Sequence, residues 1–183
     1  ATECTHAVVF NVREQTWYDT ILPNGGRSAG QFAQVYRYPI MIGSQAADGG
    51  GYKLWQHETG VDEFDGQYTN AIPSFFETAD VSAVAPPEGG QSSNKALRVG
   101  YVEPDFVQTG AMKMNISGRR NARAPLVIGP DYFFDPDTQL LYPKEERREL
   151  RFRFESNTAG GDYQMGIPLA HIEPGTGTIL GSR

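Results

Sequence analysis

Hydrophobic and polar residues alternate along several short stretches in the second half of the chain. Apolar residues occupy every other position at 97–101, 112–116 and 150–154. A period of two is typical of a β-strand with one face in a core and one face in water. Phe152 and Phe154 lie on the apolar side of the clearest stretch, so we expect both in the core.

The first half contains shorter extended stretches. Alternation at 8–12 is followed, after a polar gap, by a second extended stretch at 16–20, which predicts a hairpin. Residues 36–42 predict another strand, and we expect it at a sheet edge because Pro39 has no backbone N–H for a central ladder.

Glycine and proline punctuate the whole chain. The 21 Gly and 12 Pro residues are spread along it and divide it into short pieces, which favours strands over helices. The charged stretch 143–150 lacks an apolar stripe and is interpreted as a turn. The sequence therefore predicts an all-β fold, with a β-sandwich-like domain preceded by strands that resemble propeller-blade material.

The predicted domain organisation follows from composition. Residues 79–94 are rich in Ala, Pro, Gly and Ser, as in linkers and long surface loops. We expect a β-strand region over 1–80 that could be a partial propeller, a linker or long loop over 81–94, and an antiparallel β domain over 95–183.

Composition excludes several classes of protein. The chain has 183 residues, a net charge of −6 and a single cysteine. One cysteine rules out an internal disulfide framework and a cysteine-based zinc finger. No stretch is long and apolar enough to predict a membrane helix, and the acidic balance argues against a dedicated nucleic-acid sheath.

Basic residues gather near the end of the second half. Arg151 and Arg153 share one face of a predicted strand and could present a row of cations. Such a row could contact phosphate or an acidic partner surface. Alternatively, it is a solvated face that pairs with acids close in sequence. These acids are Glu145, Glu146, Glu149 and Glu155.

Neither a metal site nor a cofactor site is predicted. His6, His57 and His171 are too far apart in the sequence to form a local ligand pair. Oxygen-rich turns can hold calcium, but acids are also ordinary turn residues, and turn chemistry is the preferred interpretation here. The turn in question contains Asp131, Asp135 and Asp137.

Adjacent aromatic residues are the last signal. Phe75 and Phe76 place one ring on each face of an extended segment, and so do the aromatics at 132–134. This pattern fits a two-sided sandwich core, an aromatic interface to another subunit, or stacking on sugar rings. We expect Phe75 and Phe76 to pack between subunits or domains.

An ordered series of five phrases carries a resemblance to a known family. The phrases are WQHETGVD at 55–62, AIPSFFET at 71–78, VEPDF at 102–106, LRFRFESN at 150–157 and GGDYQMG at 160–166. In this order, they resemble the C-terminal part of the nozzle or tail-hub structural proteins of short-tailed bacteriophages, sometimes described as stabilising packaged DNA. The similarity runs from about residue 17 to residue 174.

The resemblance implies a virion protein without catalysis. Family members are propeller-based subunits of a homo-oligomeric ring that continues the DNA channel below the portal and adaptor, and they are several times longer than this chain. The implied partners are the portal, adaptor and other tail components, with possible non-specific DNA contact and no membrane. On this view Arg151 and Arg153 face a partner or the channel.

Two other functions stay open. One is a carbohydrate-binding β-sandwich of an adhesin or receptor-binding module, which would display Trp55 or Tyr132 beside an acid in a groove. The other is a glycan-cleaving enzyme. Its carboxylate pair would be Glu103 with Asp105, and the alternative pair is Glu77 with Asp80.

Overall fold

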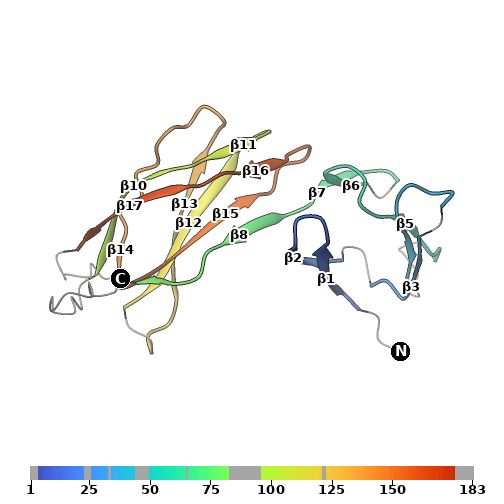
Figure 1. The fold of residues 1–183 in the computed structure, drawn as a ribbon, viewed down its shortest axis with the longest axis horizontal. Coiled ribbons are helices and arrows are strands. Elements are labelled where there is room, and N and C mark those ends of the chain that lie inside the picture. Colours follow the sequence, from blue (N-terminus) through green and yellow to red (C-terminus); the bar gives the residue numbers. More distant parts are fainter. Residues whose placement is uncertain are drawn as a thin grey trace. The chain divides into compact units, whose positions relative to one another are not determined.

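The computed structural model describes residues 4–22, 26–32, 34–43, 50–64, 66–82, 96–120 and 123–175. These residues form strands and no helix, which confirms the predicted all-β fold (Figure 1). None of them therefore belongs to a helix long and apolar enough to cross a membrane. The chain divides into two compact units, Ala1–Gly60 and Val61–Arg183, and each is described by itself.

The second unit contains a two-layer β-sandwich. Its larger sheet has five strands, in the order β13-β12-β15-β8 with β9 also paired to β15, and the smaller sheet has the order β14-β10-β17. The larger sheet consists of β8 (Ser74–Glu77), β9 (Val81–Ser82), β12 (Met112–Arg119), β13 (Val127–Phe134) and β15 (Glu149–Ser156). The smaller sheet consists of β10 (Leu97–Glu103), β14 (Glu146–Arg147) and β17 (Leu169–Pro174).

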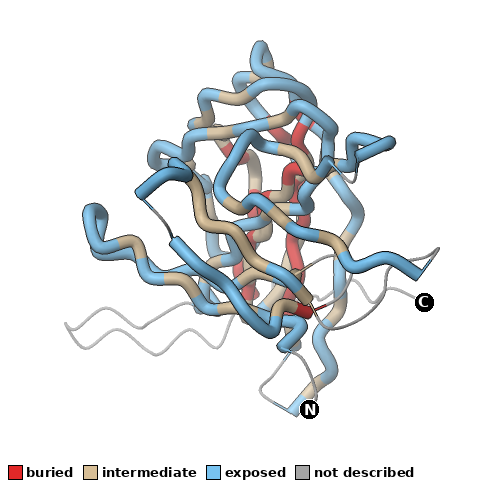
Figure 2. The backbone as a smooth tube through the Cα atoms, turned by 90° about the vertical axis from the view of Figure 1, so that its right-hand side faces the viewer, coloured by how far each residue is buried: buried red, intermediate tan, exposed pale blue. Residues whose placement is uncertain are grey.

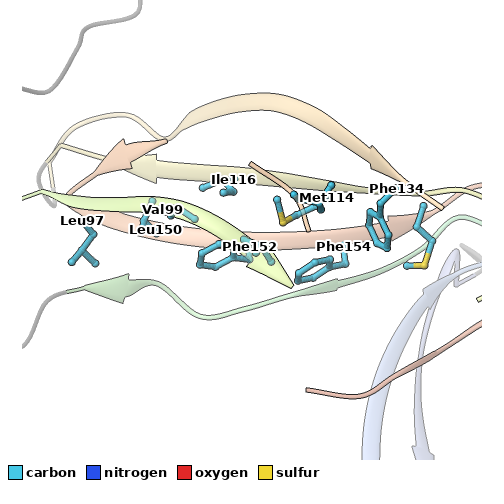
Figure 3. Packing of buried hydrophobic residues seen from close by; sticks show 11 residues of the cluster. Leu97, Val99, Met114, Ile116, Phe134, Leu150, Phe152 and Phe154 are labelled. Atoms are coloured by element: carbon cyan, nitrogen blue, oxygen red, sulfur yellow. The ribbon is translucent and has the colours of Figure 1, made fainter. Parts of the chain in front are cut away.

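The hydrophobic core lies between these two sheets. β10 contributes Leu97 and Val99, which face apolar side chains of β12 and β15 (Figure 3). Phe152 and Phe154 are only 5% and 3% exposed, so their predicted place in the core is confirmed. Apart from Gly26 in the first unit, the buried segments of the tube belong to residues 96–175 of the second unit (Figure 2). The other core residues are Val102, Met112, Met114, Ile116, Phe134, Leu141 and Leu150.

Strand β10 departs from the predicted alternation. The pattern placed residues 97, 99 and 101 on one face, but the pairing with β17 shifts register between Val99 and Tyr101. A bulge inserts one extra residue and exchanges the faces beyond it. Val102 is therefore the buried residue, at 1% exposure, and Tyr101 lies on the outer face of the sheet.

Two small antiparallel pairs complete the second unit. β11 (Phe106–Gln108) pairs with β16 (Tyr163–Met165), and β6 (Asp62–Phe64) pairs with β7 (Thr69–Ala71). The Phe106 ring lies 5.1 Å from that of Phe154, which extends the aromatic part of the core.

The first unit consists of a hairpin and a three-stranded sheet. β1 (His6–Asn11) pairs with β2 (Thr16–Ile21), which confirms the predicted hairpin. β3 (Ala29–Gln31), β4 (Ile40–Ile42) and β5 (Leu54–Gln56) form an antiparallel sheet with β4 in the middle. The predicted edge position of this strand is wrong. Pro39 precedes β4, so the N–H that it lacks is not needed within the strand. The Pro39 carbonyl accepts a hydrogen bond from His57 N at 2.8 Å.

Apolar side chains of the first unit are not gathered into a core. Among its described residues, no apolar side chain is buried. A propeller blade is a four-stranded sheet, whereas these residues form sheets of two and three strands. The exposed large apolar residues are Val8, Phe10, Val12, Trp17, Tyr18, Ile21, Phe32, Val35, Tyr36, Ile42, Tyr52 and Leu54.

The division of the chain differs from the predicted one. β8 and β9 pair with β15, so residues 61–82 fold with the second unit rather than with a region spanning 1–80. The predicted linker 81–94 begins with the two residues of β9, and its remainder lies outside the described residues.

Candidate functional site

The outer face of the five-stranded sheet brings together several of the residues singled out in the sequence, among them Arg151, Arg153 and Phe75. Leu150, Phe152 and Phe154 point into the core, so the intervening residues of β15 point outward. In the pairing of β8 with β15, Glu77 lies opposite Arg153 and Phe75 lies opposite Glu155. We call this outer surface of β8, β15, β12 and β13 the charged face.

Arg151 is held by two carboxylates from the β8–β9 segment. Its Nε lies 2.9 Å from Asp80 Oδ1, and its Nη1 lies 3.0 Å from Glu77 Oε1. The hydrogen bond to Asp80, with the charges of both acids, raises the pKa of Arg151 above its ordinary value. Arg151 therefore links β15 to the edge strand β8 and to the segment that follows it.

Arg153 combines ionic and aromatic contacts. Its guanidinium carbon lies 3.7 Å from the centre of the Phe75 ring, in the geometry of a cation–π contact. Its Nε lies 3.2 Å from Glu155 Oε2, and its Nη1 lies 3.7 Å from Glu77 Oε2. Glu77 thus bridges both arginines of β15.

Lys113 continues the row onto β12. Its Nζ lies 3.2 Å from Asp131 Oδ2 and 3.5 Å from Glu155 Oε1. The hydrogen bond to Asp131, followed by the charge of Glu155, raises the pKa of Lys113. Beside it, the Asn115 amide donates to the carbonyl of Gly129 and to Asp131 Oδ1.

The acids of this row outnumber its bases by one. Lys113, Arg151 and Arg153 give three positive charges, against four negative charges from the acids that pair with them. Of the partner acids expected from the sequence, only Glu155 pairs with one of these arginines. The remaining partners of Arg151 and Arg153 are Glu77 and Asp80, which were not expected and which come from β8 and the segment after it. Arginines held by carboxylates suit contact with a protein surface better than binding of phosphates.

Exposed aromatic rings flank the charged face. Phe75 is 51% exposed at one edge of the sheet, and Phe133 is 71% exposed on β13 at the other. A shallow hollow of about 250 Å³ opens beside Lys113, Phe133 and Glu155. Phe76 lies on the opposite face of β8, across from Phe154, and is 40% exposed.

The aromatic residues expected to bind sugars have structural contacts. The Tyr132 hydroxyl donates to the Pro143 carbonyl at 2.8 Å, the ring packs against the core, and burial raises the pKa of Tyr132. In the first unit, the Trp55 ring lies 4.5 Å from the Arg27 guanidinium carbon and 5.3 Å from Lys53 Nζ.

The expected catalytic pair Glu103 and Asp105 is engaged in two separate contacts. Asp105 Oδ2 accepts from Ile167 N at 2.7 Å and so fixes the turn before β17. Glu103 Oε1 lies 2.8 Å from His171 Nε2 on the outer face of the smaller sheet. These contacts suit structural roles for both carboxylates.

A second aromatic group, which sequence spacing did not reveal, surrounds His171. The His171 ring stacks on Tyr101 with their centres 3.7 Å apart, and the Tyr142 ring lies 6.3 Å from that of Tyr101. The bulge in β10 places Tyr101 on this outer face, and β17 supplies His171 opposite it. This aromatic group lies beside the Glu103 carboxylate.

The structure separates the acids of the turn that was considered as an alternative calcium site. Asp131 belongs to the charged face, whereas Asp135 lies in a turn where its backbone N–H donates to Thr138 Oγ1 at 3.0 Å. Within the described part of the chain, no group of three or more His, Cys, Asp or Glu residues is placed to hold a metal ion.

Comparison with known proteins gives no family. No family model matches the chain, and no curated protein matches it.

Proposed function

We propose that this chain is a structural protein of a bacteriophage tail or head–tail region, which acts by contact with other chains and helps to retain or guide packaged DNA. The ordered phrases between residues 55 and 166 are the source of the viral assignment. The all-β fold is compatible with it. In this role the protein joins a ring of its own copies next to the portal, adaptor and other tail components.

The observation that carries the proposal is the exposure of apolar side chains on small sheets in the first unit. A two-stranded hairpin is marginally stable alone, and sheets need a covered apolar face to be stable. The rings of Phe10 and Trp17 contact each other across β1 and β2 in a tilted arrangement, with their centres 4.5 Å apart, yet both remain exposed. Burying such surfaces against neighbouring chains supplies a driving force for assembly.

The charged face supports a contact role for the second unit. Its arginines are already oriented by carboxylates, so little side-chain entropy is lost when a partner binds. It also combines Arg with exposed Phe, residue types that are enriched in protein interfaces.

Localisation in virions tests the proposal. Antibodies raised against the full chain should label purified phage particles at the tail or at the head–tail junction in electron micrographs. Particles made without the gene serve as the control. Labelling absent from particles, or confined to the host cell envelope, would overturn the proposal.

The aromatic group around His171 favours a second candidate function, carbohydrate binding. Tyr142 is exposed, and the Glu103–His171 pair next to Tyr101 offers hydrogen-bonding groups beside an aromatic surface. If sugars bind here, the full chain should retain glycans on an array, and Tyr142→Ala should abolish retention while Phe133→Ala should not. An array without signal eliminates this candidate.

A further inference from the structure

The open edge of the larger sheet is strand β8. Among the described strands, β8 pairs only with β15, and its residues from Phe75 to Glu77 are exposed. An unpaired strand edge is a template for another strand. The opposite edge, β13, is less suited to this because it contains Pro130 and a register shift against β12.

The hydrogen-bonding register shows which backbone groups of β8 are available. Thr78 N donates to Phe152 O at 2.9 Å, so the pair Thr78–Phe152 is of the hydrogen-bonded kind. Such pairs alternate with non-bonded pairs along an antiparallel ladder. Ser74 and Phe76 therefore bond to β15, and the N–H and C=O groups of Phe75 and Glu77 point to the open side.

We propose that two copies of this chain pair through β8, antiparallel and centred on Phe76. In this register Phe75 of each copy lies opposite Glu77 of the other, and the two pairs exchange about four backbone hydrogen bonds. This inference rests on the proposed function in one respect: the proposed function requires copies of the chain to assemble, and the inference assigns one of the contacts between them. A closed ring would need a further, different contact.

The side chains of β8 are self-complementary in this register. The partly exposed Phe76 meets Phe76 of the second copy in a non-bonded pair, where side chains approach most closely and aromatic pairs are favourable. On the outer face, Arg153 lies over Phe75, so its guanidinium comes next to Glu77 of the second copy. Opposite charges thus meet across the contact, and no like charges lie directly opposite.

Cysteine cross-linking tests the centre of the contact. Cys4 is the only cysteine in the chain, so Phe76→Cys is made in a Cys4→Ser background. Directly opposed residues of a non-bonded pair have Cα atoms about 4.5 Å apart, within disulfide range. The matched control is Ser74→Cys on the same strand and face, where the two cysteines would lie about 14 Å apart.

The expected result is a disulfide-linked dimer that forms at least about tenfold faster for Phe76→Cys than for Ser74→Cys, because only the former meets disulfide geometry. Equal rates, or no dimer from either variant, would overturn the proposal. Virion labelling is measured separately. Cross-linking of a chain that is absent from particles would refute the proposed function alone, and labelled particles without cross-linking would refute this contact alone.

A backbone variant tests the hydrogen bonds themselves. Phe75→Pro removes the N–H that points to the open side and leaves the ladder to β15 intact, whereas Phe75→Ala removes the ring and keeps the N–H. Self-association measured by sedimentation equilibrium should be at least about fivefold weaker for Phe75→Pro than for Phe75→Ala, since two interchain bonds are lost. Equal affinities of the two folded variants would contradict pairing through this edge. Melting curves verify that both variants remain folded.

Discussion

Arg151 and Glu77 decide how firmly the edge of the larger sheet is attached. Arg151 reaches Asp80 and Glu77 at 2.9 and 3.0 Å, and Glu77 also reaches Arg153. These acids lie more than seventy positions from Arg151 in sequence. The arginine therefore forms tertiary contacts as well as lying on the surface.

Charge reversal at Arg151 should destabilise the second unit. Arg151→Glu places a carboxylate against Asp80 and Glu77, so like charges replace two ion pairs. We expect a lower melting temperature than for Arg151→Gln, with a difference that shrinks at high salt because screening weakens both effects. Arg148→Glu makes the same charge change at an exposed position and should melt close to the parent. Equal melting of the two Glu variants would mean that the Arg151 pairs contribute nothing.

His57 should respond to pH in the first unit. Burial and the nearby Arg27 lower the pKa of His57 below 6.5, although Glu58 opposes them. At pH values between the lowered pKa and 6.5, the unfolded chain binds more protons at His57 than the folded chain does. The free energy of unfolding should therefore fall as the pH drops through this window. An NMR titration of the imidazole should give a midpoint below 6.5.

Arg27→Gln separates the causes of this shift. Arg27 Nε donates to His57 Nε2 at 3.2 Å. The variant should move the His57 midpoint upward but leave it below 6.5, because burial is the larger cause. A midpoint at or above 6.5 in the parent protein would contradict a partly buried imidazole that is neutral in the folded state.

At the scale of elements, β15 is the central strand of the sandwich. It pairs with β12 on one side and with β8 and β9 on the other, and one of its faces is buried. Phe152→Ala should cost about 3–5 kcal/mol of unfolding free energy, as is typical for a buried Phe. Phe133→Ala, on the exposed side of β13, should change stability by less than about 0.5 kcal/mol. Denaturant titrations of both variants check the register, and similar costs would show that the assignment of faces is wrong.

The strands with one face in the core were predictable from sequence because alternation records burial directly. It identified β12 and β15 together with their buried Phe, Met and Ile residues. It misplaced the end of β10, because a bulge changes the face without changing composition. It also could not place β8 beside β15, since strand pairing over such a separation leaves no local pattern.

The same limit applies to the candidate site. Arg151 and Arg153 were identified as one row because they are two residues apart on a strand. Their partners Glu77 and Asp80 could not be identified, and acids nearby in sequence were expected instead. The aromatic group around His171 was missed for a related reason, because it depends on the bulge and on the pairing of β10 with β17.

At the scale of the whole molecule, the two units differ in how they can be stabilised. The buried apolar residues of the described chain lie between Ala96 and Phe154, all in the second unit. The described residues of the first unit have backbone pairing and surface contacts but no buried apolar side chain. Hydrophobic burial is the main favourable term in folding, so the units should differ greatly in stability when separated.

Separate fragments test this difference. Residues 61–183 should unfold in a single cooperative transition close to that of the full chain, because this fragment retains both sheets and the core between them. Residues 1–60 alone should show no cooperative transition, since short sheets without a covered apolar face are at most marginally stable. Calorimetry and amide NMR dispersion measure both properties. A sharp melt and dispersed amide signals from residues 1–60 would show that this unit is stable without partners, and the driving force for assembly would then have to come from the charged face and the edge at β8.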